Sequence, residues 1–92
     1  MLILGIESAT ARVGCAIGGH EGVLASAHSA RPRRHAESLA PQIEFITGQA
    51  GVKLSEIGVV AVDVGPGPYT GLRVGITTAM ALAQTLRIPM IG

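Results

Sequence analysis

Short apolar runs separated by polar or glycine-rich turns predict three strands near the start of the chain. The runs are Leu2–Ile6, Arg12–Ile17 and Val23–His28. The glycine-rich segment 18–22, between the second run and the third, is typical of a hairpin turn. Because consecutive strands joined by short turns pair antiparallel, we expect a three-stranded meander.

Residues 35–50 have the periodicity of an amphipathic helix. Phe45 and Pro41 lie opposite the apolar stripe, so a monomer would expose its only phenylalanine. Pro41 either kinks this helix or begins its main part. The apolar residues that recur at helical spacing, and that we expect to face the core, are Ala36, Leu39, Ala40, Ile43, Ile46 and Ala50.

The remaining pattern predicts a strand at 58–64, a helix at 70–87 and a fifth strand opening at 88–92. An ordinary surface helix would carry Lys and Glu on its outward face, whereas this one is small and uncharged there. We therefore expect the second helix to be covered on both sides. Its expected core residues are Leu72, Ile76, Ala79, Ala83 and Leu86, and its expected outward residues are Val74, Thr78, Ala81 and Thr85.

The predicted order is βββαβαβ, an α/β fold in which a meander is followed by two crossover helices. Such an order gives a mixed five-stranded sheet with a parallel portion and right-handed crossovers. A complete unit of this kind would end on another helix. We therefore expect residues 1–92 to form an N-terminal domain that is incomplete at its C-terminal end, with a second domain beyond it.

Composition narrows the class of protein. With 92 residues, 48% of them hydrophobic and 14% charged, the chain allows one small folded domain and is not disordered. A net charge of +1 gives no general field for nucleic acid. The basic segment Arg31–Arg34 is interpreted as a solvated connector, with a phosphate or RNA contact as the alternative.

The chain offers few signs of reactive chemistry. A single cysteine, Cys15, excludes a disulfide scaffold, and its neighbours are small residues rather than a base. His20, His28 and His35 are too far apart in sequence to form a metal-binding pair on one helical turn, so no metal site is predicted. Asp63 either caps a neighbouring turn or binds a hydrated cation.

Location follows from two observations on the apolar segments. The longest uncharged run, 74–86, is too short to span a bilayer. The apolar N-terminus lacks the basic region of a signal peptide. We therefore expect a cytoplasmic protein without membrane contact.

A turn rich in glycine and proline, residues 65–75, joins the predicted fourth strand to the second helix. Glycine permits unusual backbone angles, proline ends the strand, and Thr70 is placed to cap the helix. A glycine-rich turn at a helix N-terminus can also bind an anion, and a tight structural connection is the competing interpretation. The residues assigned to the structural turn are Gly65, Pro66, Gly67, Thr70 and Gly71.

The predicted element order is similar to the duplicated core of the actin, Hsp70 and sugar-kinase superfamily, which has a ribonuclease H-like (ASKHA) fold. In that superfamily an Asp-x-Gly-like turn after the first strand approaches nucleotide phosphates. The corresponding residues here run from Glu7 to Thr10, with Glu for Asp and Ala9 for Gly. The resemblance implies that the nucleotide-proximal residues are Glu7, Ser8, Thr10, Gly65 and Gly67.

Three stretches carry a closer resemblance, to the TsaB (YeaZ) family, formerly called glycoprotease-like. Ile3–Thr10 resembles the family's I-L-A-I-D-T-S/A-T, and His35–Pro41 resembles H-S-E-x-L-L-P. Residues 65–75 resemble G-P-G-S-F-T-G-L-R-I-G, with Pro68 for Ser and Tyr69 for Phe. The three motifs occur in the family's order along the chain.

This resemblance implies a non-catalytic scaffold rather than an enzyme in its own right. In the family, TsaB binds its paralogue TsaD and, with TsaE, supports formation of N6-threonylcarbamoyladenosine at position 37 of tRNA. TsaD holds the metal and transfers the threonylcarbamoyl group, so no catalytic residue or cofactor is expected here, and ATP or ADP only in the assembled complex. TsaB alone forms homodimers through the same N-terminal helices.

The implied partner interface comprises the outward residues of both helices: Pro41, Phe45, Val74, Thr78, Ala81 and Thr85. Contact with tRNA would come through the complex. The competing hypothesis is an ATP-dependent enzyme or kinase domain of the actin-like class, with residues 7–10 and 65–67 around the phosphates. The small, uncharged helix face and the departures at Glu7 and Ala9 favour the scaffold.

Overall fold

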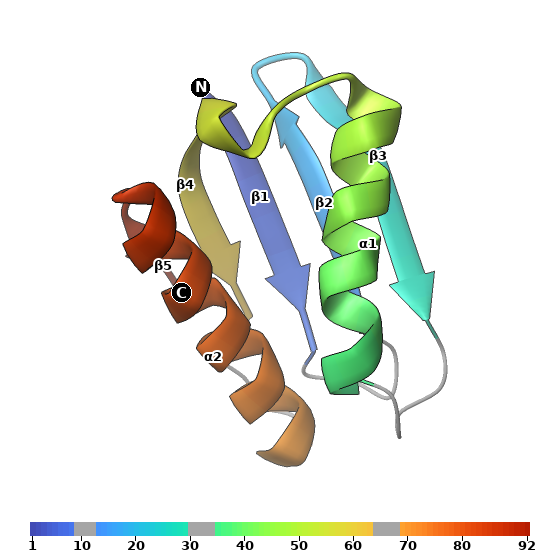
Figure 1. The fold of residues 1–92 in the computed structure, drawn as a ribbon, viewed down its shortest axis with the longest axis vertical. Helices are drawn as coiled ribbons and strands as arrows, with labels where there is room; N and C mark the ends of the chain where they lie inside the picture. Colours follow the sequence, from blue (N-terminus) through green and yellow to red (C-terminus); the bar gives the residue numbers. More distant parts are fainter. Residues whose placement is uncertain (9–12, 30–34, 64–68) are drawn as a thin grey trace.

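The computed structural model describes residues 1–8, 13–29, 35–63 and 69–92, with side chains from residue 39 in the first helix and from residue 73 in the second (Figure 1). The predicted order βββαβαβ is confirmed, and most bounds shift by a residue or two. The elements are β1 (Leu2–Glu7), β2 (Val13–Gly19), β3 (Gly22–Ser29), α1 (His35–Ala50), a 3₁₀ turn η2 (Leu54–Glu56), β4 (Ile57–Val62), α2 (Tyr69–Leu86) and β5 (Met90–Ile91).

The five strands form one mixed sheet, as the sequence predicts, and the structure gives their order as β3-β2-β1-β4-β5. The meander supplies the antiparallel pairs β1–β2 and β2–β3. The crossovers through α1 and α2 supply the parallel pairs β1–β4 and β4–β5. The carboxyl ends of β1 and β4 consequently meet at one edge of the sheet.

Both helices lie on the same face of the sheet (Figure 1). Strand alternation explains why: on β1, Leu4 and Ile6 are buried, whereas Ile3 and Glu7 on the opposite face are exposed. Leu4 and Ile6 pair in register with Val60 and Val62 of β4. The helix-facing side of the sheet is therefore the core, and within the described residues no helix covers the other side.

Helix α1 buries most of the predicted stripe, with one correction. Leu39, Ile43 and Ile46 are buried as expected, but Ala40 is exposed and Thr47 takes the inward position instead. The Thr47 hydroxyl donates a hydrogen bond to the Glu44 carbonyl at 2.9 Å, which satisfies it in an apolar setting. The side chain of Ala36 lies outside the described residues.

The proline in α1 neither begins nor ends the helix. Pro41 lies inside a helix that runs continuously from His35 to Ala50, and its ring is exposed. It therefore does not set the first turn, which was one of the two interpretations of its position.

Helix α2 buries Gly75, Ala79 and Ala83 against the sheet. The expected core residue Ile76 is only partly buried. The helix begins at Tyr69, so Thr70 lies inside it rather than at its N-cap, and the side chains of Thr70 and Leu72 lie outside the described residues. Neither helix in the described ranges has the length and apolarity needed to cross a membrane.

Candidate functional site

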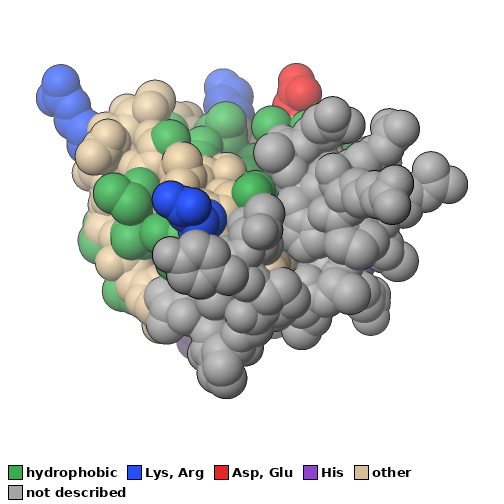
Figure 2. Space-filling model, turned by 90° about the horizontal axis from the view of Figure 1, so that it is seen from below, with side chains coloured by type: hydrophobic (Ala, Val, Ile, Leu, Met, Phe, Trp, Pro, Cys, Tyr) green, Lys and Arg blue, Asp and Glu red, His purple; other side chains and the backbone are tan. Residues whose placement is uncertain are grey.

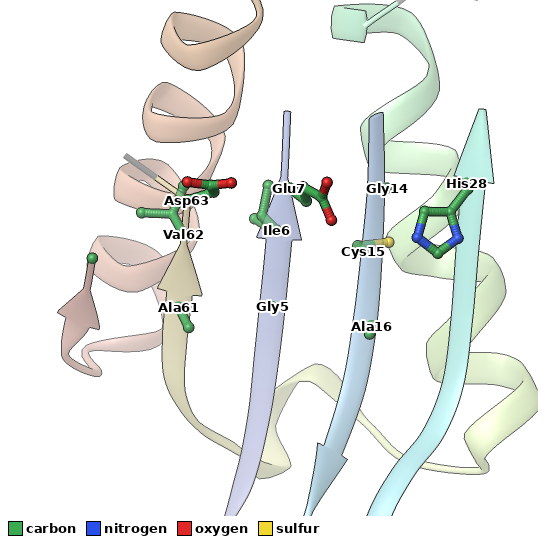
Figure 3. A pocket seen from close by; sticks show the side chains of 11 residues that line it. Gly5, Ile6, Glu7, Gly14, Cys15, Ala16, His28, Ala61, Val62 and Asp63 are labelled. Atoms are coloured by element: carbon green, nitrogen blue, oxygen red, sulfur yellow. The ribbon is translucent and has the colours of Figure 1, made fainter. Parts of the chain in front are cut away.

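A pocket of about 370 Å³ opens on the helix-free face of the sheet, near the carboxyl ends of β1 and β4 (Figure 3). Register explains the hollow, because Gly5 of β1 pairs with Ala16 of β2 on one side and with Ala61 of β4 on the other. Three neighbouring strands thus place small residues side by side. The sheet surface is therefore recessed at these residues, and longer side chains surround the recess.

Two carboxylates stand on the rim of this pocket. Glu7 is the last residue of β1, and Asp63 directly follows β4. The Asp63 backbone N–H donates to the Ile6 carbonyl at 3.1 Å, which holds the start of the next loop beside β1. Both side chains are exposed, and Figure 3 shows them at the ends of the neighbouring strands β1 and β4. Ligands of parallel α/β sheets commonly bind outside the carboxyl ends of the strands, which is where this pair lies.

His28 on β3 forms the opposite wall of the pocket, against the backbone of Gly14. A β-carbon added at Gly14 would lie 2.9 Å from His28 Nε2 and 2.8 Å from the Ala27 carbonyl oxygen. Glycine at this position therefore makes room for the imidazole. Across the described residues, no group of three or more His, Cys, Asp or Glu side chains is placed to hold a metal ion.

The predicted nucleotide-proximal residues separate in the structure. Glu7 lines the pocket, but the buried Ser8 points into the helix layer, where its hydroxyl contacts Gly75 of α2 and has no hydrogen-bond partner. Thr10, Gly65, Pro66 and Gly67 lie outside the described residues, and Gly71 falls within α2 rather than in a turn. Residues 69–75 of the predicted turn belong to α2 instead, and the interpretation of residues 65–68 stays a prediction.

Cys15 lies on the helix-facing side of β2 and is buried. Its thiol lies 3.8 Å from Gln42 Oε1 of α1, and Gln42 Nε2 donates to the Val13 carbonyl at 3.4 Å. Burial raises the pKa of the Cys15 thiol to about 11. The thiol is therefore protonated at neutral pH, which makes it a poor nucleophile.

Four of the six residues predicted to face outward on the two helices are exposed. Phe45 has 58% of its surface exposed, and Pro41, Ala81 and Thr85 are exposed as well. Val74 and Thr78 are a correction: both are half-buried, and Val74 packs against the core. Residues 75 and 79 lie on the side of α2 that meets the sheet. Val74 and Thr78 lie next to that side rather than opposite it.

The exposed residues of α2 that the sequence reasoning missed are Arg73, Thr77, Met80 and Gln84. Met80 is 46% exposed. Ala79 and Ala83 are buried against the sheet, and the helical period counted from them places these residues on the exposed side of α2. We use the name outward helix face for Pro41, Phe45, Thr77, Met80, Ala81, Gln84 and Thr85.

Charged side chains do not gather in the view of Figure 2. Among the described residues visible there, Lys or Arg side chains and an acidic side chain stand apart among hydrophobic and uncharged groups. The basic segment 31–34 lies outside the described residues. An RNA contact through it stays a prediction.

Comparisons with known proteins agree with this architecture. Residues 23–92 match the family described as TsaD, tRNA N6-adenosine threonylcarbamoyltransferase. The chain is 35% identical over 92 residues to the tRNA threonylcarbamoyladenosine biosynthesis protein TsaB of Escherichia coli, covering 100% of this chain and 39% of that protein. It is 32% identical over 107 residues to a tRNA N6-adenosine threonylcarbamoyltransferase of Zymomonas mobilis, covering 99% of this chain and 30% of that protein.

Among solved structures, YeaZ from Pseudomonas aeruginosa superposes with a TM-score of 0.92 at 29% identity. The match covers 99% of this chain and 43% of that one. The chain thus spans less than half the length of these relatives, and it matches them over almost all of its own length.

Proposed function

Because this chain belongs to the TsaD family and, within it, to the TsaB (YeaZ) group, we propose that it is a scaffold for making N6-threonylcarbamoyladenosine in tRNA. In this role it binds and activates TsaD through the outward helix face and contributes no catalytic residue. TsaE joins the same complex, and tRNA contacts the chain through that complex in the cytoplasm.

The outward helix face is the observation that carries the proposal. It exposes the only phenylalanine of the chain on α1, and Met80, Ala81 and other small or uncharged side chains on α2. Exposed aromatic residues anchor protein interfaces, and small residues let helix backbones approach closely. Two helices from each partner then pack as a four-helix bundle, and a stable contact of this kind buries more than about 1,000 Å² in total.

The same face serves a homodimer when TsaD is absent, so the two assemblies compete. Ala81→Arg tests both, because it places a charge on an exposed position without touching the buried line of α2. We expect the variant to fold, to lose the homodimer contact at the outward helix face, so that it self-associates more weakly than the unaltered chain, and to lose TsaD binding. Sedimentation with and without TsaD measures both effects.

Ser55→Arg is the matched control for this experiment. It puts the same charge on an exposed small residue in η2, away from the outward helix face. The control should associate like the unaltered chain. If Ala81→Arg also associates normally in both experiments, the partner surface lies elsewhere.

A second function, ATP binding by an actin-like enzyme, is favoured by the pocket at Glu7 and Asp63. Its volume of about 370 Å³ is in the range of small-molecule sites, and carboxylates suit Mg²⁺. The departures from the Asp-x-Gly turn count against it. Calorimetry with MgATP separates the two functions: weak or absent binding fits the scaffold, and micromolar affinity for these 92 residues alone would favour the enzyme.

A further inference from the structure

Strand β3 is the edge strand at one border of the sheet, and β2 is its neighbour on the inner side (Figure 1). The outer side of an edge strand presents backbone N–H and C=O groups to which another strand can pair. Natural proteins usually protect such an edge with charged residues or proline. The sequence of β3, Gly-Val-Leu-Ala-Ser-Ala-His-Ser, has no Lys, Arg, Asp, Glu or Pro.

A bulge at Leu24 disrupts one end of this edge. The pairing with β2 passes from Ile17↔Ala25 to Gly18↔Val23, so Leu24 has no partner on β2. A bulge bends its strand and disturbs further pairing locally. The regular part of the edge is therefore Ala25–Ser29, with Ala27 at its centre.

We propose that a second copy of this chain pairs antiparallel with β3 about a two-fold axis at Ala27, which runs perpendicular to the sheet. With this axis, the regular part of the edge pairs along its whole length, and the helices of both copies lie on the same face of the joined sheet. Ala27 then lies opposite Ala27 of the second copy, and His28 lies opposite Ser26 of the second copy. The two five-stranded sheets join into one of ten strands.

The side chains along this edge suit pairing with a copy of themselves. Ser26 and His28 are exposed, whereas Ala25 and Ala27 are half-buried and pack against the core. In the proposed register each directly opposed pair joins a small residue to a small residue or the imidazole to a hydroxyl. No like charges meet, so the electrostatic cost of opposing identical strands is absent.

Helix α1 is the reason to expect a second copy rather than an unrelated extended peptide. It packs over both β2 and β3, and strands are spaced about 4.8 Å apart. Extending that spacing across the axis places the two α1 helices about 10 Å apart, the distance at which helices pack side by side. A second copy thus gains a helix contact in addition to the strand pairing, which a peptide strand does not.

Two double variants at the exposed positions of β3 test the proposal, each made in the Ala81→Arg background to remove association through the outward helix face. Ser26→Lys with His28→Asp places opposite charges across the axis. Ser26→Lys with His28→Lys places like charges there. We expect the charge-paired variant to dimerise at least about tenfold more tightly by sedimentation, a difference that shrinks at high salt.

Equal association of the two double variants would overturn the edge pairing, whatever Ala81→Arg does to the outward helix face. A further measurement uses Ala81→Arg alone, with β3 unaltered, and therefore does not depend on the folding of the double variants. We expect it to retain a concentration-dependent dimer, and a monomer at every concentration would refute the proposal. Failure of the scaffold proposal would instead appear as unaltered TsaD binding by Ala81→Arg.

Discussion

Ser8 and Gly75 are in direct contact where the end of β1 meets α2. A β-carbon added at Gly75 would collide with the Ser8 hydroxyl and lie 3.2 Å from Ser8 Cβ and 3.6 Å from Ile6 Cγ2. The α2 backbone therefore approaches β1 as closely as glycine allows. This contact sets the height of the helix above the sheet, and with it the position of the outward helix face.

Gly75→Ala should lower the free energy of unfolding, because overpacking of about 1–3 kcal/mol exceeds the gain in helix propensity of about 1 kcal/mol. Gly48→Ala in α1 is the matched control, since a β-carbon there meets nothing within 4 Å. The control should stabilise the fold by about 0.5–1 kcal/mol. Urea midpoints of the two variants check both signs, and equal stabilisation would contradict the close contact.

Gly14→Ala should destabilise the fold by about 1–3 kcal/mol, because the new methyl group meets both His28 and the Ala27 carbonyl. Removing the imidazole with His28→Ala should restore part of that loss but not all of it, since the carbonyl stays in place. A double-mutant cycle measured by urea unfolding tests the coupling. Full additivity of the two changes would mean that His28 does not lie against Gly14.

The raised pKa of Cys15 predicts a fall in stability at alkaline pH. Folding favours the neutral thiol, so its contribution is fully present below the unfolded pKa of 9.0 and is lost as pH rises toward about 11. The slope is at most about 1.4 kcal/mol per pH unit for one proton. Thermal unfolding between pH 8 and 11 should show this fall in the unaltered chain, and Cys15→Ala should lack it.

Phe45→Ala should leave the stability of the monomer within about 0.5 kcal/mol, because the ring is 58% exposed. Its association through the outward helix face should weaken, since an aromatic anchor is lost. Ile43→Ala, on the buried side of the same helix, should show the opposite profile by losing about 2–5 kcal/mol of stability. Thermal unfolding and sedimentation separate the two effects, and a Phe45→Ala variant that associates normally would remove Phe45 from the interface.

The hydrophobic pattern by itself determined the elements and their order. Strand alternation at Leu4 and Ile6, and the helical spacing of Leu39, Ile43 and Ile46, depend on local geometry that neighbouring residues share. The mixed sheet follows as well, because short turns impose antiparallel pairs and crossover helices impose parallel ones.

Only the tertiary structure decided which margin of each helix is buried. Thr47 rather than Ala40 turns inward, and Val74 packs against the core, because the tilt of a helix on a sheet depends on distant partners. The pocket arises because Gly5, Ala16 and Ala61 become neighbours only after three strands pair. The contact of Ser8 with Gly75 likewise joins residues far apart in sequence, and periodicity carries no information about such distances.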